Sequence, residues 1–311
     1  MKDKKIAVVM GGPSSEAEVS RKTGTAVLNA LKSKGYNADG LEFEPKNFAE
    51  QIKKSGCDVV FNAMHGKFGE DGVMQGALDL LGIPYTGSGV LAAAITMDKA
   101  ASKRIFRAEG ISTPYSKTYV RKDMECVLVE ELVAEFSLPL VIKAASQGSS
   151  IGVFIVEKCE DIEPALKTAF AYSQEVLVEE FINGRELTVA VWGNEKQEAF
   201  PIIEITTSSG RYDYESKYTK GASTHIIPAV IPAELTAQIK QLAIKTFMVC
   251  GCKGVARVDV MLSKENVPYV LEVNSVPGMT ELSLVPDAGR AMGVEFPELC
   301  ERLLQMVDYE K

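Results

Sequence analysis

The sequence lacks several features that would place it in a class at once. No apolar run approaches the roughly 18 residues of a membrane-spanning helix, and residues 1–6 lead directly into a strand pattern without the apolar stretch of a secretion signal. Only two histidines occur, His65 and His225, so a histidine-rich zinc site is not expected. Any bound metal should be a hard cation held by oxygens. We therefore expect a cytoplasmic protein that makes no membrane contact.

Paired cysteines and positive charge are also scarce. The six cysteines include no C-x-x-C pair, which fits reduced thiols better than a disulfide framework. The formal net charge of -8 argues against nucleic acid, because binding to its phosphates requires clustered lysine and arginine. No G-x-G-x-x-G fingerprint follows the first apolar run, which disfavours a dinucleotide oxidoreductase.

What the sequence does have is length and a regular alternation of patterns. A chain of 311 residues with 46% hydrophobic content is too long for one compact core, and two or three domains are expected. Strand-like runs at residues 5–10 and 58–62 alternate with helical patterns over roughly the first 90 residues. This alternation predicts a small parallel, Rossmann-like sheet with functional loops at the carboxyl ends of its strands.

Two glycine-containing loops fall at those strand ends. Residues 11–20 read GGPSSEAEVS, where Ser14 or Ser15 could simply cap the following helix. Residues 65–72 read HGKFGEDG, and three glycines in eight residues indicate a backbone shaped for a ligand, although an ordinary loop is the alternative.

A lysine followed by small residues marks the middle of the chain. The strand pattern at residues 140–143 ends in Lys143, and AASQGSSIG leads into a second strand at residues 153–156. Backbone N–H groups of such a loop can face phosphate oxygens, with the lysine as a point charge beside them. The motif is not a Walker A loop, where the lysine follows the glycines. A lysine extending to solvent from a strand end is the alternative.

Two polar strands near the end of the chain suggest a metal site. Residues 254–262 place Arg257 and Asp259 on one face, and residues 268–274 place Glu272 and Asn274 on one face. If these strands pair as a hairpin, Asp259, Glu272 and Asn274 converge, and their oxygens suit Mg²⁺. One residue of slip in the register would turn the acids away, and a salt-bridge cluster around Arg257 is the alternative. With the Lys143 loop, this hairpin suggests an enzyme that handles ATP.

Ordered motifs along almost the whole chain carry a family resemblance. They are Gly11-Gly12-x-Ser14-x-Glu16-x-x-Val19-Ser20, His65-Gly66 through Gly72, Tyr85-Thr86-Gly87-Ser88-Gly89, Met97-Asp98-Lys99, Gly148-Ser149-Ser150-x-Gly152, residues 212–218, Gly251-Cys252-Lys253-Gly254 and Glu272-x-Asn274-x-x-Pro277-Gly278-Met279-Thr280. The sequence thereby resembles the D-alanine–D-alanine ligases of the ATP-grasp superfamily.

The resemblance implies an α/β fold in three domains, an N-terminal Rossmann-like parallel sheet followed by a two-part ATP-grasp fold. The expected units are residues 1–96, 97–186 and 187–311, the last with a lid loop at 208–228. The implied activity joins two D-alanines through an acyl phosphate made from ATP, for peptidoglycan precursor synthesis. ATP and two Mg²⁺ ions, or Mn²⁺, are the implied cofactors, and a homodimer is the family habit.

The resemblance also assigns roles to individual residues. Asp259, Glu272 and Asn274 would hold the metal ions; Lys99 and Lys143 would contact the ATP phosphates; Lys217 would reach the transferred phosphate; Glu179 and Glu186 would face the adenosine; Arg257 and the N–H of Gly278 would stabilise the oxyanion; Glu16, with Ser149, Tyr218 and His65, would surround the first D-alanine; and Ser283 would bind the carboxylate of the second.

Two rival classes stay open at this point. Another ATP-grasp ligase with a different second substrate, such as a D-hydroxy acid, would keep the ATP residues and change around Glu16, Tyr218 and Ser283. A non-catalytic nucleotide-binding protein would show damage in the metal or oxyanion set, and here Arg257 and the three expected metal ligands are all present.

Overall fold

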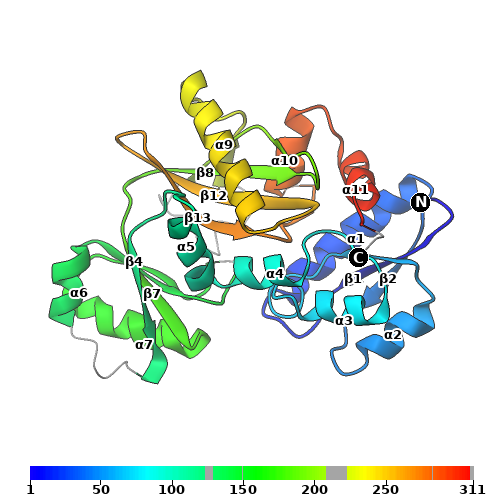
Figure 1. Ribbon diagram of the computed structural model, residues 1–311, viewed down its shortest axis with the longest axis horizontal. Coiled ribbons are helices and arrows are strands. Elements are labelled where there is room, and N and C mark those ends of the chain that lie inside the picture. Colours follow the sequence, from blue (N-terminus) through cyan, green and yellow to red (C-terminus); the bar gives the residue numbers. More distant parts are fainter. Residues whose placement is uncertain (123–128, 149, 208–222, 282, 309–311) are drawn as a thin grey trace.

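The computed structural model describes residues 1–122, 129–148, 150–207, 223–281 and 283–308. The strands within these ranges form three sheets, which we call the N-terminal, central and C-terminal sheets (Figure 1). None of the helices in the described ranges is long and apolar enough to cross a membrane.

The N-terminal sheet is parallel, in the order β2-β1-β3. Its elements are β1 (Lys5–Met10), α1 (Ala17–Ser33), β2 (Asn37–Glu42), α2 (Phe48–Ser55), β3 (Val59–Asn62), α3 (Val73–Leu81) and α4 (Val90–Met97). β1 lies in the middle with its apolar side chains buried, because both of its edges are paired and helices cover its faces. The predicted small parallel sheet is therefore confirmed.

The central sheet is antiparallel, in the order β4-β7-β5-β6. Its elements are β4 (Ser116–Val120), α6 (Val129–Phe136), β5 (Leu140–Ala144), β6 (Val153–Val156), a short 3-10 helix (Cys159–Asp161), α7 (Ile162–Tyr172) and β7 (Glu175–Glu180). β5 and β6 pair as the hairpin expected around the Lys143 loop. Helix α5 (Lys99–Ala108) leads into this sheet from α4.

The C-terminal sheet has the order β11-β10-β8-β12-β13, with β9 paired to β8. Its elements are β8 (Gly184–Trp192), β9 (Glu198–Ala199), β10 (Ile203–Thr207), β11 (Ser223–Ile226), α9 (Ala233–Val249), β12 (Val255–Ser263), β13 (Pro268–Asn274), α10 (Leu284–Ala291) and α11 (Phe296–Gln305). The loop expected over 208–228 differs at its end, since β11 pairs antiparallel with β10. Residues 208–222 lie outside the described ranges, and a lid there stays a prediction.

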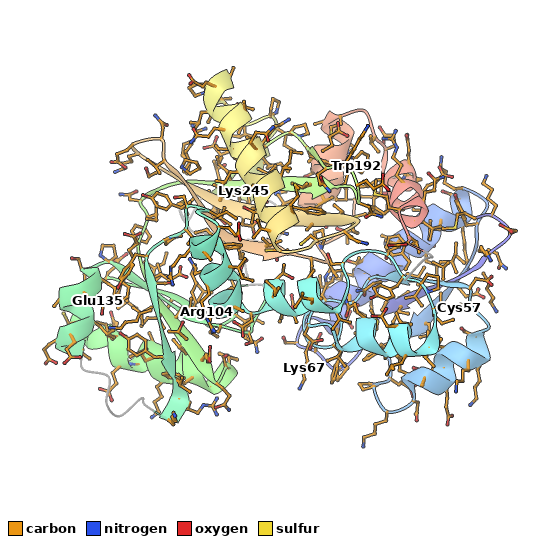
Figure 2. All side chains as sticks on the ribbon, viewed as in Figure 1. Cys57, Lys67, Arg104, Glu135, Trp192 and Lys245 are labelled. Atoms are coloured by element: carbon orange, nitrogen blue, oxygen red, sulfur yellow. The ribbon has the colours of Figure 1, made fainter. Side chains whose placement is uncertain are left out.

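The two ends of the chain share one hydrophobic core. Side chains of β1 and α1, such as Ile6 and Leu31, belong to the same buried cluster as Leu299 of α11. Trp192 lies in this cluster, 4.8 Å from the ring of Phe200, and Figure 2 shows it beside the C-terminal helices. This packing crosses the boundaries expected after residues 96 and 186, which stay predictions.

Candidate active site

A cavity of about 900 Å³ lies between the central and C-terminal sheets. Its walls include Lys99 of α5, Lys143 of β5, Glu186 of β8, Asp259 of β12 and Glu272 of β13. The structure thus brings together, around one space, side chains that the sequence places up to 173 residues apart, from position 99 to position 272. Lys99 and Lys143 thus share this space with carboxylates of the C-terminal sheet.

The β12–β13 hairpin has the register that the metal-site hypothesis requires. Asp259 is opposite Glu272 and Arg257 is opposite Asn274, while the register shifts by one residue directly after Asp259. In an antiparallel pair, directly opposed residues project on the same face. The predicted convergence of Asp259, Glu272 and Asn274 is therefore confirmed as a geometry, while their role as metal ligands stays a prediction.

Asp259 is surrounded by hydrogen-bond donors. Its Oδ1 accepts from Arg257 Nε at 2.8 Å and from the Thr188 hydroxyl at 2.6 Å. Its Oδ2 accepts from Arg257 Nη2 at 2.8 Å and from Asn274 Nδ2 at 3.0 Å. An ionised carboxylate offers about four lone-pair positions, and the one that faces Asn274 becomes available to a cation if the Asn274 amide is turned over. The β12–β13 face is therefore a polar network that orients Arg257 through its fork of N–H groups.

The donor set of this face fits a hard cation. Among the described residues no group of three histidine, cysteine, aspartate or glutamate side chains could hold a metal ion. Mg²⁺, however, is commonly bound by one or two carboxylates together with substrate phosphates. Asp259 and Glu272 supply the two carboxylates, and an Asn274 amide can present its oxygen instead of its nitrogen. The residues therefore fit a magnesium ion that is bound together with a phosphate ligand.

Lys99 connects Glu272 to the loop after Lys143. Its ammonium lies 3.0 Å from Glu272 Oε2 and donates a 2.6 Å hydrogen bond to the carbonyl of Gln147. The backbone N–H of Lys99 bonds the Ala145 carbonyl at 3.0 Å. Lys99 therefore holds the start of the small-residue loop against α5, with its charge at the acidic hairpin.

Lys143 shares a carboxylate with a second lysine. Glu179 of β7 pairs through Oε2 with Lys143 at 2.7 Å and through Oε1 with Lys103 of α5 at 3.1 Å. Burial opposes the charge of Lys143, yet the neighbouring Glu179 carboxylate raises the pKa of Lys143. Burial likewise opposes the charge of Glu179, and the two lysines lower its pKa. The opposite charges thus hold Glu179 and Lys143 in their ionised forms. Burial lowers the pKa of Lys103 to about 8, so this lysine is still mostly charged at pH 7.

The N-terminal loops bring Glu16 and His65 to the same region. Glu16 is buried, and a Cβ added at Gly66 or Gly148 would lie 2.5 or 2.9 Å from its Oε2. The carboxylate of Glu16 therefore touches both the second N-terminal loop and the loop after Lys143. Ser14 does not cap α1, as the capping alternative supposed; its hydroxyl donates to the His65 carbonyl at 2.9 Å and joins the two N-terminal loops.

Burial changes the charge state of two groups in these loops. Desolvation lowers the pKa of His65 to about 4, so its ring is neutral at pH 7, and its Nε2 lies 3.0 Å from the Thr23 hydroxyl. Burial, and then the charge of Glu16, raise the pKa of Glu70 to about 8. Glu70 Oε2 accepts the Gly66 N–H at 2.6 Å, although part of the residue surface is exposed. A neutral Glu70 thus stands beside the Glu16 carboxylate.

The turn after β13 positions Gly278 and Ser283. The Ser283 hydroxyl accepts the Thr280 N–H at 3.1 Å and lies 2.8 Å from the Thr280 hydroxyl. A Cβ added at Gly278 would meet Ser283 Oγ at 3.1 Å, so the two predicted residues are neighbours.

Three predicted residues, Ser149, Lys217 and Tyr218, lie outside the described ranges. Glu186 and Glu179, both predicted to face adenosine, line the cavity, and the carboxylate of Glu179 is paired with two lysines. Sequence reasoning missed Lys103, Glu70 and Thr188. Lys103 lies four residues after Lys99, on the same face of α5, and this spacing is the only signal that could have found it.

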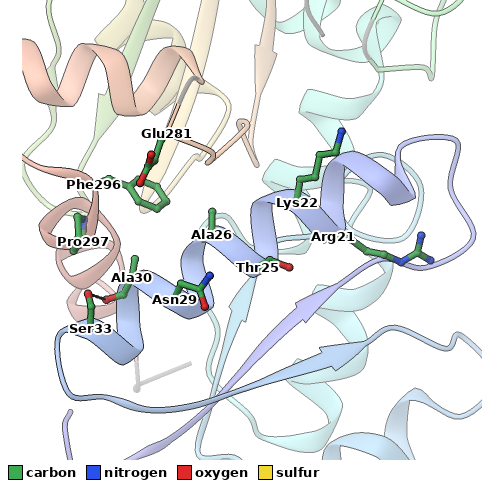
Figure 3. Close-up of a pocket in the computed structure, with 10 residues that line it drawn as sticks. All are labelled: Arg21, Lys22, Thr25, Ala26, Asn29, Ala30, Ser33, Glu281, Phe296 and Pro297. Carbon is green, nitrogen blue, oxygen red and sulfur yellow. Dashed lines mark hydrogen bonds between the residues drawn. The ribbon is translucent and has the colours of Figure 1, made fainter. Parts of the chain in front are cut away.

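A second hollow, of about 620 Å³, lies between α1 and the start of α11 (Figure 3). Residues of α1, among them Arg21 and Lys22, form one side, and Glu281, Phe296 and Pro297 form the other. None of the predicted site residues lines it.

The antiparallel central sheet and the C-terminal sheet enclose a cavity lined by lysines, acids and oxygen donors suited to magnesium. This arrangement defines an ATP-grasp ligase fold. Residues 38–88 match the family model described as D-ala D-ala ligase N-terminus, and residues 105–305 match D-ala D-ala ligase C-terminus. The chain therefore belongs to the D-alanine–D-alanine ligase family, as its motifs predicted.

Individual relatives agree with this family over nearly the whole length. The D-alanine–D-alanine ligase of Pelotomaculum thermopropionicum is 50% identical over 306 residues, covering 97% of this chain and 96% of that one. The Bacillus anthracis D-alanine–D-alanine ligase complexed with ATP is 34% identical with a TM-score of 0.85, covering 97% of both chains. VanG, a D-Ala:D-Ser ligase from Enterococcus faecalis, is 31% identical with a TM-score of 0.83, covering 98% of this chain and 99% of that one.

Proposed function

We propose that this chain joins two D-alanines into D-alanyl-D-alanine at the expense of ATP, as a step of peptidoglycan precursor synthesis. The observation that carries the proposal is the cavity in which Lys99 and Lys143 face Asp259 and Glu272. This arrangement places cations and a cation-binding face where a triphosphate needs both. Membership of the ligase family supports the choice of D-alanine.

In the first step, a carboxylate of D-alanine attacks the γ-phosphate of ATP, and ADP leaves. Lys99 and Lys143 neutralise phosphate oxygens, and Lys217 is proposed to reach the phosphate that is transferred. Asp259, Glu272 and Asn274 would hold two Mg²⁺ ions or Mn²⁺, which when bound neutralise charge on the phosphates. Glu186, at the wall of the cavity, is proposed to face the adenosine. Glu179 is proposed to face it as well, while its carboxylate also pairs with two lysines.

In the second step, the amine of the other D-alanine attacks the acyl phosphate, and phosphate leaves from the tetrahedral intermediate. Arg257 and the Gly278 N–H are proposed to stabilise the oxyanion, because preorganised donors act on charge that develops in the transition state. The two hydrogen bonds to Asp259 fix the plane of the Arg257 guanidinium for this task.

The amino acids are held by the N-terminal loops and the turn after β13. Glu16 is proposed to pair with the ammonium group of the first D-alanine, with Ser149, Tyr218 and the neutral His65 around it. Ser283 is proposed to bind the carboxylate of the second D-alanine. We also propose that the enzyme acts in the cytoplasm.

The test is ADP release by the purified protein with MgATP and D-alanine. Parallel reactions contain L-alanine, D-lactate with D-alanine, or no amino acid. We expect ADP release that requires D-alanine and produces the dipeptide. Turnover only with another pair of substrates would support the ATP site and show that the assignment of the acceptor pocket to D-alanine is wrong.

A ligase with a different second substrate is the second candidate, and the similarity to VanG favours keeping it. Tyr218 is the proposed selector, because a phenylalanine at this lid position is associated with acceptance of D-lactate. Tyr218→Phe should therefore shift the products of a D-alanine and D-lactate competition towards the ester. An unchanged product ratio would remove the tyrosine as selector.

We propose a homodimer through α3 and α4. Val73, Leu80, Val90 and Leu91 on these helices are exposed, Leu80 to 91%. α4 carries no charged residue and α3 carries only Asp79. An apolar surface of this kind is typical of an interface. A double substitution, Leu80→Glu with Leu91→Glu, should produce a monomer in light scattering, whereas the same change at exposed Val230 should not alter the mass.

A further inference from the structure

Lys103 lies behind the nucleotide cavity and does not line it. Its side chain is only 1% exposed, as is that of Glu179. Lysine is rarely buried unless its charge is paired, because removing an ammonium from water is costly. The chain nevertheless keeps a lysine here, on the helix that also carries Lys99. A charge at this cost suggests a function beyond packing.

The contacts of Lys103 lead to both walls of the cavity. Its ammonium lies 3.1 Å from Glu179 Oε1 and donates a 2.7 Å hydrogen bond to the Thr113 hydroxyl. Glu179 holds Lys143 on the central sheet. The Thr113 hydroxyl donates to the Val270 carbonyl at 2.8 Å, two residues before Glu272 on β13. Lys103 is therefore joined, through one intermediate on each side, to Lys143 and to the acidic hairpin.

The charges of this cluster explain why two lysines share one carboxylate. Glu179 and Lys143 alone would form a neutral pair, with the lysine drawn towards the carboxylate at 2.7 Å. With Lys103 on the second oxygen, the cluster of Lys103, Glu179 and Lys143 has a net charge of +1. Lys143 and Glu179 both line the cavity, and Lys143 is the more exposed of the two, with 12% of its side chain exposed against 1%. In a site withdrawn from water, this net charge acts strongly on an anion.

We propose that Lys103 is a positioning residue of the nucleotide site, which offsets Glu179 so that Lys143 presents positive charge to the phosphates. The inference rests on the proposed function only in taking the ligand of Lys143 to be a nucleotide phosphate. Lys103 touches neither substrate nor reacting atoms; it acts through Glu179.

The test compares Lys103→Met with the wild type in calorimetric binding of MgADP and of adenosine. We expect the dissociation constant of MgADP to rise about tenfold, equivalent to about 1.4 kcal/mol, because a charge beside the phosphates is lost. The affinity for adenosine should be unchanged, since adenosine has no phosphate. An equal loss for both ligands, or no loss for either, would overturn the proposal.

Two further variants keep the test decisive. Lys117→Met removes a lysine from an exposed pair with Glu135, also attached to the central sheet, and both affinities should stay at the wild-type value; Figure 2 shows Glu135 on the outer helix α6. If Lys103→Met fails to fold, Thr113→Val serves instead, because it keeps the Lys103 ammonium and removes its hydrogen bond to the Thr113 hydroxyl. It should weaken MgADP binding less than tenfold and leave adenosine binding unchanged, and an equal loss for both ligands would again count against the proposal.

The pH dependence of MgADP binding gives an independent readout. Burial lowers the pKa of Lys103 to about 8. The charged groups that act on it are Glu179 and Lys143 of the central sheet and Arg107 of α5. As pH rises through 8, the wild type should lose the extra charge and bind MgADP less tightly, while Lys103→Met should not show this step. Absence of ligase turnover in the wild type would contradict the proposed function but not these binding results.

Discussion

The two charged ends of the cavity are built differently. At the central sheet, one carboxylate is enclosed by two lysines, and Lys103 and Glu179 are almost fully withdrawn from solvent. At the hairpin, Glu272 pairs with Lys99 at 3.0 Å, and 22% of its side chain is exposed. The first cluster has an excess of positive charge and is largely buried, whereas in the second a lysine occupies a position for which a metal ion would compete. One end is a fixed support, and the other is an exchangeable pair.

The difference suggests how the site accepts a metal–nucleotide complex. A magnesium ion held by Glu272, as proposed above, would repel the Lys99 ammonium, and the accompanying phosphates would attract it. On this proposal Lys99 would exchange the Glu272 carboxylate for a phosphate and keep an anionic partner. Lys143 needs no such movement, because Lys103 already offsets Glu179. The comparison predicts that substitutions at the exchangeable end affect turnover most.

The largest effect is expected for Glu272→Gln. Removing this carboxylate leaves Asp259 as the only acid of the hairpin face, and charge on the transferred phosphoryl group is then poorly neutralised. We expect ADP release to fall by at least about 10³-fold. Circular dichroism should stay unchanged, and Glu265→Gln in the exposed turn of the same hairpin should be fully active. An active Glu272→Gln enzyme would contradict the metal assignment.

A smaller effect is expected at the fixed end. Lys143→Met should reduce kcat/KM for ATP by about 10²-fold, the loss that follows removal of one preorganised donor. The reduction should exceed that caused by Lys103→Met, because only Lys143 lines the cavity. Steady-state kinetics with varied MgATP would measure both variants. If the buried lysine proved more important than the lining one, the distinction between support and contact would be wrong.

The smallest effect at neutral pH is expected for Glu70→Gln. Glu70 carries a proton at pH 7, because burial and the charge of Glu16 raise its pKa to about 8. Glutamine imitates the protonated acid in charge and shape, so activity at pH 7 should change less than about threefold, which corresponds to less than about 0.7 kcal/mol. Glu16→Gln, in contrast, should abolish D-alanine-dependent turnover.

The same group links folding stability to pH. The folded state holds a proton that the unfolded chain releases near pH 4.5, so stability is lost as pH rises from there through about 8. In Glu70→Gln this contribution to the slope is absent. Melting temperatures measured from pH 5 to 9 should therefore diverge, with the variant gaining on the wild type towards high pH. Parallel curves would show that Glu70 is ionised in the folded protein.

Much of the hairpin could be predicted because a strand shows two faces in its sequence. Asp259 and Glu272 stand at alternating positions among buried valines, so their common face follows from the pattern. The register did not follow from the sequence; the irregularity after Asp259 was invisible there. The parallel N-terminal sheet was similarly predictable from its alternating strands and helices.

The partners of Glu179 could not be predicted. Lys103 lies 76 positions before Glu179, and apart from its four-residue spacing from Lys99 nothing local indicates that this lysine of α5 turns inward. Lysine is usually found on the surface. Only the folded structure shows that the Glu179 carboxylate lies next to Lys103 of α5. Glu70 was missed for a related reason, since its charge state depends on burial next to Glu16.

The shared core of α1 and α11 has a consequence for the order in which the chain is made. The first sheet leaves the ribosome early, yet the helix that covers part of its apolar surface begins only at Phe296. Until the last residues emerge, side chains such as Leu31 lack their final neighbours and expose apolar surface that invites association. A chain that stops a few dozen residues short would lack its end and would also leave the apolar surface of α1 and the N-terminal sheet uncovered.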